Sequence, residues 1–170
     1  MDSKPLKQLM LGVALCKIGL LITFSYNNII RSILKRKYIM KKTIEVVGAI
    51  IIDNQKILCA QRGPGKSLAH YWEIPGGKVE EHETPIEALK RELTEELLIS
   101  VNVEEELFES TTYEYDFGFV HLTTFICHLI EGVPTLTEHV NIKWLPSSKL
   151  GTLEWAPADI PTVEKLKTTL

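Results

Sequence analysis

Apolar residues follow two different periodicities along this chain, and each predicts a different kind of element. The run at residues 43–53 (TIEVVGAIIID) is β-branched and apolar, as in a buried strand. Turn residues at 53–55 and a second apolar run at 56–61 predict a hairpin. Two longer runs of alternating, aromatic-rich sequence at 101–115 and 117–130 predict a pair of long antiparallel strands.

One long helix is predicted between these pairs of strands, and its start is well defined. Thr84 and Glu87 have the spacing of a capping box, and Pro85 stands at the first helical position, where its missing N–H costs nothing. Apolar residues then recur at steps of three and four, so they form one buried stripe. The residues of this stripe are Ile86, Leu89, Leu93 and Leu97.

The remaining pattern completes a layered α/β arrangement. A short strand at 142–145, one helical turn at 147–150 and a closing helix at 158–166 follow the long strands. The sum is a mixed sheet with one long helix and a shorter one at the end. Helices are therefore expected on both faces of the sheet.

Three carboxylates of the long helix, Glu92, Glu95 and Glu96, share a face different from the buried stripe. Exposed pairs at this spacing repel by a few tenths of a kcal/mol. They form either a solvated acidic face or a cation site. The Pro-Gly-Gly turn at 75–77 favours the cation site, because such turns bring the backbone close to a ligand. Mg2+ prefers oxygen ligands and is typically held by carboxylates together with substrate phosphates, with Mn2+ as the alternative ion.

The segment at 76–99 resembles the Nudix box, G-x5-E-x7-R-E-U-x-E-E-x-G-U, in which U is a bulky aliphatic residue. Eight of the nine defined positions match: Gly77, Glu83, Arg91, Glu92, Leu93, Glu95, Glu96 and Ile99. The departure is Leu98, where the family pattern has glycine. Because that glycine follows the helix, we expect Leu98 to take a left-handed conformation at a cost of roughly 1 to 2 kcal/mol. The departure should affect stability or the helix end rather than the chemistry.

This resemblance implies the Nudix fold, an α/β/α sandwich with a mixed sheet, over about residues 43 to 168. In similar enzymes a glutamate of this helix and a backbone carbonyl of the Gly-Gly turn ligate the divalent cation, which corresponds here to Glu96 and Gly76. Glu92 and Glu95 complete the metal site, and Glu92 is alternatively the residue that orients or deprotonates the attacking water.

Arg91 is the third residue of the catalytic set, with Glu92 and Glu95. Its expected role is to neutralise Glu83 and hold the loop to the helix; the alternative is an ordinary surface cation. Glu83 and Gly77 are structural positions of the motif. Outside the box, Glu138 matches a loop glutamate that approaches the metal in similar enzymes, and is otherwise a solvated charge.

The stretches YWEIPGGKVE and WAPADIPTVEKLK resemble the MutT-like branch of the family, which includes 8-oxo-dGTP and CTP pyrophosphohydrolases. The resemblance implies that Asp159 contacts the base, since an ionised carboxylate accepts hydrogen bonds from base donors. The alternative, compatible role for Asp159 is to cap the following helix. The other implied substrate-binding residues are Arg62, Ser67, Glu73, Ile74, Pro75 and Gly76.

We therefore predict a Mg2+-dependent enzyme that hydrolyses (d)NTP to (d)NMP and pyrophosphate. Oxidised or modified nucleotides such as 8-oxo-dGTP, or CTP-like substrates, are the expected targets, which would suit sanitation of the nucleotide pool and DNA repair. One alternative is a Nudix hydrolase of another nucleoside diphosphate derivative. The other is a non-catalytic Nudix module that binds a nucleotide as a sensor; the complete run of residues 91–96 argues against it, because a sensor needs no metal cluster.

Composition limits the partners and the compartment. A net charge of −3 leaves no electrostatic footprint for a nucleic acid polymer, so the expected partner is a small-molecule nucleotide. The cysteines Cys16, Cys59 and Cys127 show no CxxC spacing, which is typical of reduced thiols in a cytoplasmic protein. The five histidines show no metal-ligand spacing and are expected to be structural or solvated, with His70 the one that could line the pocket.

Residues 1–40 differ in composition from the remainder, which we predict to be the Nudix domain at 41–170. The stretch at 9–24 is mostly apolar but carries Lys17 near its middle, and basic residues follow it. A membrane anchor, an amphipathic or disordered leader, and an upstream mis-start with a true start at Met40 are the three interpretations; the last is preferred. No membrane contact is expected unless residues 1–39 are expressed.

Overall fold

The computed structural model describes residues 41–170. The predicted leader at 1–40, with Cys16 and Lys17, lies outside the described residues. Within residues 41–170, no helix combines the length and apolar character needed to cross a membrane. The strands are β1 (Thr43–Asp53), β2 (Lys56–Gln61), β3 (Trp72–Glu73), β4 (Gly76–Lys78), β5 (Ser100–Tyr115), β6 (Gly118–Glu131) and β7 (Asn141–Leu145). The helices are α2 (Pro85–Leu97), the 3-10 helix η1 (Ser147–Thr152) and α3 (Ile160–Thr169).

Strand β1 is the centre of a seven-stranded sheet with the order β3-β2-β1-β6-β5. It runs parallel to β6 and antiparallel to β2, so the sheet is mixed, as predicted. The short strand β4 also pairs with β1, with Val47 opposite Gly77, and β7 pairs with β2. This pairing fixes the glycine turn of β4 against the central strand.

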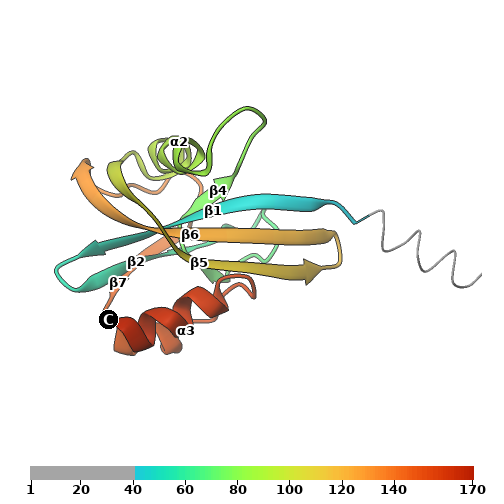
Figure 1. Ribbon diagram of the computed structural model, residues 1–170. Coiled ribbons are helices and arrows are strands. Elements are labelled where there is room, and N and C mark those ends of the chain that lie inside the picture. Colours follow the sequence, from blue (N-terminus) through green and yellow to red (C-terminus); the bar gives the residue numbers. More distant parts are fainter. Residues whose placement is uncertain (1–40) are drawn as a thin grey trace, which may run out of the picture. The chain divides into compact units, whose positions relative to one another are not determined.

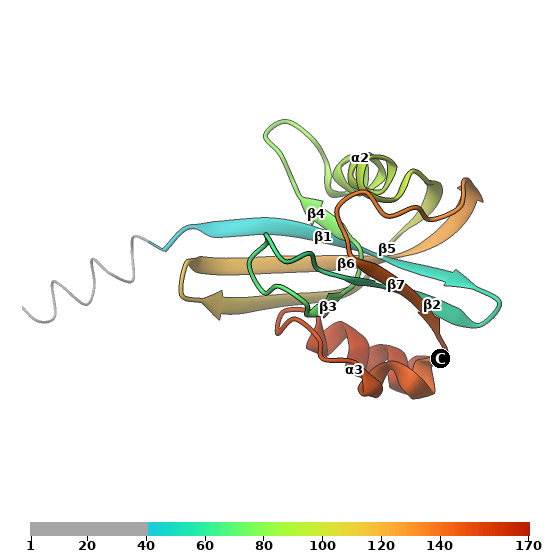
Figure 2. The ribbon, with the colours of Figure 1, turned by 180° about the vertical axis from the view of Figure 1, so that it is seen from behind.

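The core is divided between the two faces of the sheet. On one face Val47, Ala49 and Ile51 of β1 pack with the apolar stripe of α2. On the other face Ile50 belongs to a second cluster that includes Leu166 of α3. Figures 1 and 2 show α2 and α3 on opposite sides of the strands. The predicted α/β/α sandwich is therefore confirmed.

Helix α2 begins as the sequence predicts. The Thr84 hydroxyl accepts from the Glu87 N–H at 3.3 Å, and the Glu87 carboxylate accepts from the Thr84 N–H at 2.8 Å. The predicted stripe is buried except for Ile86, which is only partly buried, and Ala88 joins it. Burial of this stripe against β1 leaves the acidic residues of the helix on another face.

Replacing Leu98 with glycine should increase the free energy of unfolding by about 1 kcal/mol. Leu98 has φ 57° and ψ 37°, the left-handed conformation expected, and it is 56% exposed. Glycine removes the steric strain while losing little apolar contact. Urea unfolding measures the change. Leu98→Ala is the matched control, because it shortens the side chain but keeps Cβ; equal effects of the two substitutions would show that strain at Cβ is absent.

Candidate active site

One cleft with a volume of about 790 Å3, a size typical of small-molecule sites, collects most of the predicted site residues. Its lining includes Arg62, Ser67, Glu73, Ile74, Gly76, Gly77, Glu92, Glu95, Glu96, Glu138 and Asp159. Pro75 is not part of this lining, because its carbonyl accepts the Ala49 N–H at 2.8 Å and so faces β1. Arg91 and Glu83 also lie outside the lining. Arg91 contacts the cleft indirectly, through its hydrogen bonds to Glu92 and Glu95.

The glycine turn brings backbone and carboxylate closer together than any other residue would allow. A Cβ on Gly76 would lie 2.0 Å from the carbonyl oxygen of Val47. A Cβ on Gly77 would lie 2.2 Å from the carboxyl carbon of Glu92. Position 76 therefore requires glycine, because the clash is with backbone, whereas a side chain at Gly77 would displace the Glu92 carboxylate that rests directly on the turn.

Arg91 joins the loop before α2 to three glutamates. Its guanidinium donates to both oxygens of Glu83 at 3.1 and 2.7 Å, to Glu92 at 2.9 Å and to Glu95 at 3.4 Å. It also donates to the carbonyl of Lys78 at 3.0 Å, which ties the loop to the helix. The hydrogen bonds from Arg91 hold the pKa of Glu83 below its ordinary value. The expected pairing of Arg91 with Glu83 is present.

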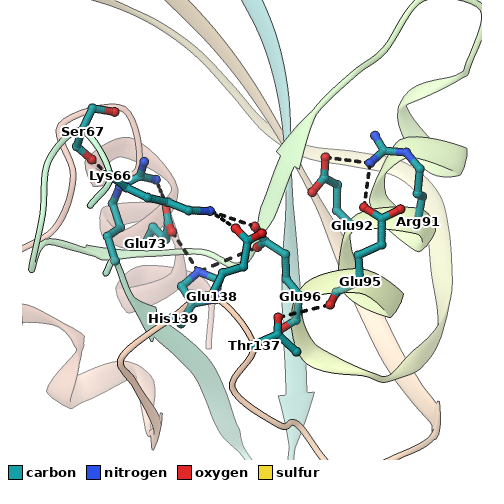
Figure 3. A network of polar contacts seen from close by, with 11 residues as sticks. Lys66, Ser67, Glu73, Arg91, Glu92, Glu95, Glu96, Thr137, Glu138 and His139 are labelled. Carbon is teal, nitrogen blue, oxygen red and sulfur yellow. Dashed lines mark hydrogen bonds and ion pairs between the residues drawn. The ribbon is translucent and has the colours of Figure 1, made fainter. Parts of the chain in front are cut away.

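Lys66, from the loop after β2, pairs with two further carboxylates of the cleft. Figure 3 shows its ammonium directed at the neighbouring carboxylates of Glu96, 3.3 Å away, and Glu138. Burial raises the pKa of Glu96, against the opposing charges of His139 and Lys66. Burial alone would lower the pKa of Lys66, but Glu138 and Glu96 outweigh it and the pKa is raised. The hydrogen bond from Lys66 lowers the pKa of Glu138.

The two groups of carboxylates line one cleft without converging on one point. In residues 41–170, no three acidic, histidine or cysteine side chains are close enough together to hold a metal ion as they stand. The carboxylates pair with Arg91 at one group, Glu92 and Glu95, and with Lys66 at the other, Glu96 and Glu138. The donors are the hard oxygens that Mg2+ prefers, so the residues fit this cation. An ion held by Glu96 and Glu138 would compete with the Lys66 ammonium for their carboxylates.

Another part of the cleft joins charged and aromatic groups. Arg62 pairs with Glu73 and donates from Nε to the carbonyl of Ser67 at 2.8 Å, which shapes the loop between β2 and β3. Tyr115 and Phe117, at the end of the β5–β6 hairpin, stack with ring centroids 5.1 Å apart and line the same cleft. These rings offer flat apolar surface, as a nucleobase requires.

Asp159 stands at the N-cap position of α3, but its side chain makes no capping hydrogen bond. It is 6% exposed and accepts the N–H of Ile74 at 2.9 Å. The capping interpretation is therefore wrong, because the carboxyl group points to β3 and the turn after it. Burial raises the pKa of Asp159 to about 8, with Glu73 acting in the same direction and Ile74 and Arg62 opposing it. Burial thus favours the protonated form of this carboxyl group, whereas the sequence analysis expects an ionised acceptor.

Comparison with known proteins identifies this arrangement of glycine turn, arginine and glutamates. A NUDIX domain model matches residues 42–166. The chain belongs to the Nudix family. The match covers every predicted site residue, from Arg62 to Asp159.

Several similar proteins of the Nudix family carry the names of enzymes that hydrolyse nucleotides. The CTP pyrophosphohydrolase of Escherichia coli K12 is 40% identical over 123 residues, which cover 72% of this chain and 90% of that protein. The 8-oxo-dGTP diphosphatase of the same strain is 34% identical over 128 residues, covering 75% and 98%. The solution structure of MutT, a Nudix hydrolase of methicillin-resistant Staphylococcus aureus 252, is 53% identical with a TM-score of 0.64, covering 76% and 98%. The chain is a Nudix hydrolase related to these proteins.

Two residues of this Nudix site escaped the sequence analysis. Lys66 lies in a glycine-rich loop whose position near the turn was the only signal. His139 was expected to be structural or solvated, and it is structural: its side chain is 3% exposed and its Nε2 lies 2.9 Å from Glu73, a contact that the sequence did not predict. The available signal was its place directly after Glu138. His70, by contrast, is exposed and does not line the cleft.

Replacing Lys66 with methionine should tighten the binding of a divalent cation in the absence of nucleotide. The ammonium must leave Glu96 and Glu138 before an ion can enter. Because Lys66 is partly exposed, solvent screens the pair and the expected gain is about two- to fivefold in affinity. Titration calorimetry with Mn2+ measures it, and Lys90→Met on the exposed face of α2 is the control. Weaker binding to the Lys66 variant would show that the ammonium does not compete.

Proposed function

We propose that this Nudix hydrolase cleaves nucleoside triphosphates to the monophosphate and pyrophosphate with Mg2+ as cofactor and Mn2+ as a substitute. The observation that carries the proposal is the composition of the cleft. The same cleft is lined by the carboxylates of α2, by the glycine turn and by the buried Asp159 beside two aromatic rings. A nucleotide needs both kinds of surface, one for its phosphates with their cation and one for its base.

The proposed metal ligands are Glu96, Glu138 and the carbonyl of Gly76, with Glu92 and Glu95 beside them. A bound Mg2+ would neutralise phosphate charge and lower the pKa of the attacking water. Glu92, or Glu95, then accepts the proton of that water as the phosphorus–oxygen bond forms and pyrophosphate leaves. Arg91 keeps both carboxylates next to the glycine turn, since it bonds to each of them and to the loop.

Asp159, Arg62 and the 63–72 loop are the proposed determinants of the base. A protonated carboxyl group both donates and accepts, so it suits a base edge that presents a donor and an acceptor together. Cytosine and guanine, including oxidised guanine, present such edges with an exocyclic amino group as a donor, which thymine lacks. The names of the relatives, CTP pyrophosphohydrolase and 8-oxo-dGTP diphosphatase, agree with this class of base.

A screen of pyrophosphate release from common and damaged (d)NTPs, with and without Mg2+, tests the proposal. We expect Mg2+-dependent release that is fastest with a cytosine or a guanine-derived nucleotide. Hydrolysis only of nucleotide sugars or dinucleotides would favour the alternative Nudix substrates. Binding of nucleotide without hydrolysis of any compound would favour a sensor and contradict the proposal.

We also propose that the protein acts in the cytoplasm, where nucleoside triphosphates are available. Cys59 and Cys127 are buried and not joined in a disulfide, which suits a reducing compartment. Burial raises the pKa of each thiol to about 12, so both remain protonated and unreactive.

A further inference from the structure

A row of polar side chains runs behind the cleft and connects its two sides. The carboxylate of Glu73 is bound at one oxygen by Arg62 and at the other by Nε2 of His139, 2.9 Å away. The same Nε2 lies 3.9 Å from a carboxylate oxygen of Glu96. Figure 3 shows the imidazole between the two glutamates. His139 therefore contacts both the proposed base side and the proposed metal side.

The imidazole is held by these contacts and by packing. Since a carboxylate oxygen only accepts, Nε2 carries the proton that is donated to Glu73. The other ring nitrogen, Nδ1, is buried and has no hydrogen-bond partner among residues 41–170. A buried nitrogen without a partner costs free energy, which an apolar side chain at this position would avoid. The histidines 121 and 128, in contrast, are substantially exposed and pair with surface glutamates.

The loop that carries His139 is anchored without the imidazole. Thr135 N–H donates to the carbonyl of Leu97 at 2.9 Å, and the Thr137 hydroxyl donates to the carbonyl of Glu96 at 2.7 Å. On the other side, Val140 N–H donates to the carbonyl of Gln61 at 3.0 Å. These backbone contacts fix the loop between α2 and β2. Loss of the imidazole should therefore leave the loop in its place.

We propose that His139 is a positioning residue that sets the Arg62–Glu73 pair and Glu96 relative to each other, so that nucleotide and metal binding both depend on it. The proposal rests on the function proposed above and adds a residue to it. The imidazole hydrogen-bonds to Glu73 and approaches Glu96 at 3.9 Å without a hydrogen bond. Partners that hydrogen-bond to a metal ligand change metal affinity or activity by about 10- to 100-fold, so the lower end of this range is expected here. Loss of the bond from His139 leaves one oxygen of Glu73 without its partner, so the Arg62–Glu73 pair is held only from the side of Arg62 and its position in the cleft can change.

The test compares His139→Leu, which fills the space without a hydrogen bond, with His139→Gln, whose amide can donate to Glu73. Mn2+ affinity and the affinity for a non-hydrolysable nucleotide are measured by calorimetry, and KM and kcat by pyrophosphate release. We expect the leucine variant to weaken Mn2+ binding and nucleotide binding by roughly tenfold each and to raise KM. The glutamine variant should recover most of both affinities.

Two matched controls separate positioning from loss of structure. Thr137→Val removes a bond that anchors the loop but leaves the imidazole, and His128→Leu removes an exposed histidine; neither should change the two affinities together. Unchanged affinities in His139→Leu, a change in only one of them, or equal losses in the leucine and glutamine variants would overturn the proposal. If the wild-type protein hydrolyses no nucleotide, the proposed function fails, while the calorimetric comparison still decides the role of His139.

Discussion

Glu96→Gln should retain less than about a tenth of the wild-type turnover at saturating Mg2+, since metal polarisation typically supplies several kcal/mol of transition-state stabilisation. Glu96 is the helix glutamate that faces both the Lys66 ammonium and His139, and its carboxylate is largely buried. Glutamine keeps the volume and removes the charge. Burial already raises the pKa of Glu96, so the folded protein ionises this group reluctantly and should lose little stability with the substitution.

Three measurements make this result decisive. Turnover is followed by pyrophosphate release, Mn2+ affinity by calorimetry, and the fold by a melting curve. Glu105→Gln, the same substitution on the exposed part of β5, is the control and should match the wild type. A Glu96 variant that keeps more than about a tenth of the rate, with an unchanged melting curve, would contradict the proposed role in metal binding.

The fold could be predicted because its signals are local. The capping box at Thr84, the periodicity of α2 and the alternation of the long strands each depend on neighbours in sequence, and the structure has each element close to the expected bounds. Leu98 is an example at a single position: a motif glycine replaced by leucine predicts a left-handed residue, and φ is 57°. The glycine turn is a second example of a locally encoded feature. Gly76 and Gly77 have no Cβ, and this absence allows their close contacts with Val47 and Glu92.

The partners within the site could not be predicted, because they depend on distant segments meeting. Lys66 and Glu138 are separated by 72 residues, and His139 and Glu73 by 66. The resemblance marks Glu73 and Glu138 as site residues, but nothing in the local sequence shows which side chains they pair with. The raised pKa of Asp159 could not be predicted either. The residue type suggests an ionised carboxylate, whereas burial against the turn after β3 raises its pKa to about 8.

Among the residues proposed to contact the base, Asp159 should have the largest effect on base selection when it is replaced. Asp159→Ala removes the group that accepts from Ile74 and lines the cleft, so KM for a cytosine or guanine nucleotide should rise far more than KM for a thymine nucleotide. A lost hydrogen bond between neutral groups is worth roughly 0.5 to 1.5 kcal/mol, so discrimination should fall by about two- to tenfold. Asp159→Asn, which donates and accepts as the protonated acid does, should keep most of the discrimination near neutral pH.

The pH dependence of base selection provides the finer test. Below pH 8 the protonated carboxyl group of Asp159 donates and accepts, and above pH 8 it only accepts. The wild-type preference for cytosine over thymine nucleotides should therefore increase between about pH 6.5 and about pH 9, because the cytosine amino group is a donor. The preference of Asp159→Asn should stay constant over this range. A parallel change in both proteins would assign the titration to another group.

The free energy of unfolding should also depend on the ionisation of Asp159, and it should decrease as the pH rises. The pKa of Asp159 is raised from 3.8 in the unfolded chain to about 8 in the folded protein, so the folded state holds the proton over this range. Its contribution to stability is present in full below pH 3.8 and is lost as the pH rises through 8. Asp159→Asn, which cannot ionise, should therefore gain stability relative to the wild type as the pH increases, as measured by urea unfolding across this range. Asp159→Ala and Asp159→Asn could instead lose the same stability at every pH and keep the wild-type ranking of substrates. Asp159 would then have only a structural role, and base selection would come from Arg62 and the 63–72 loop.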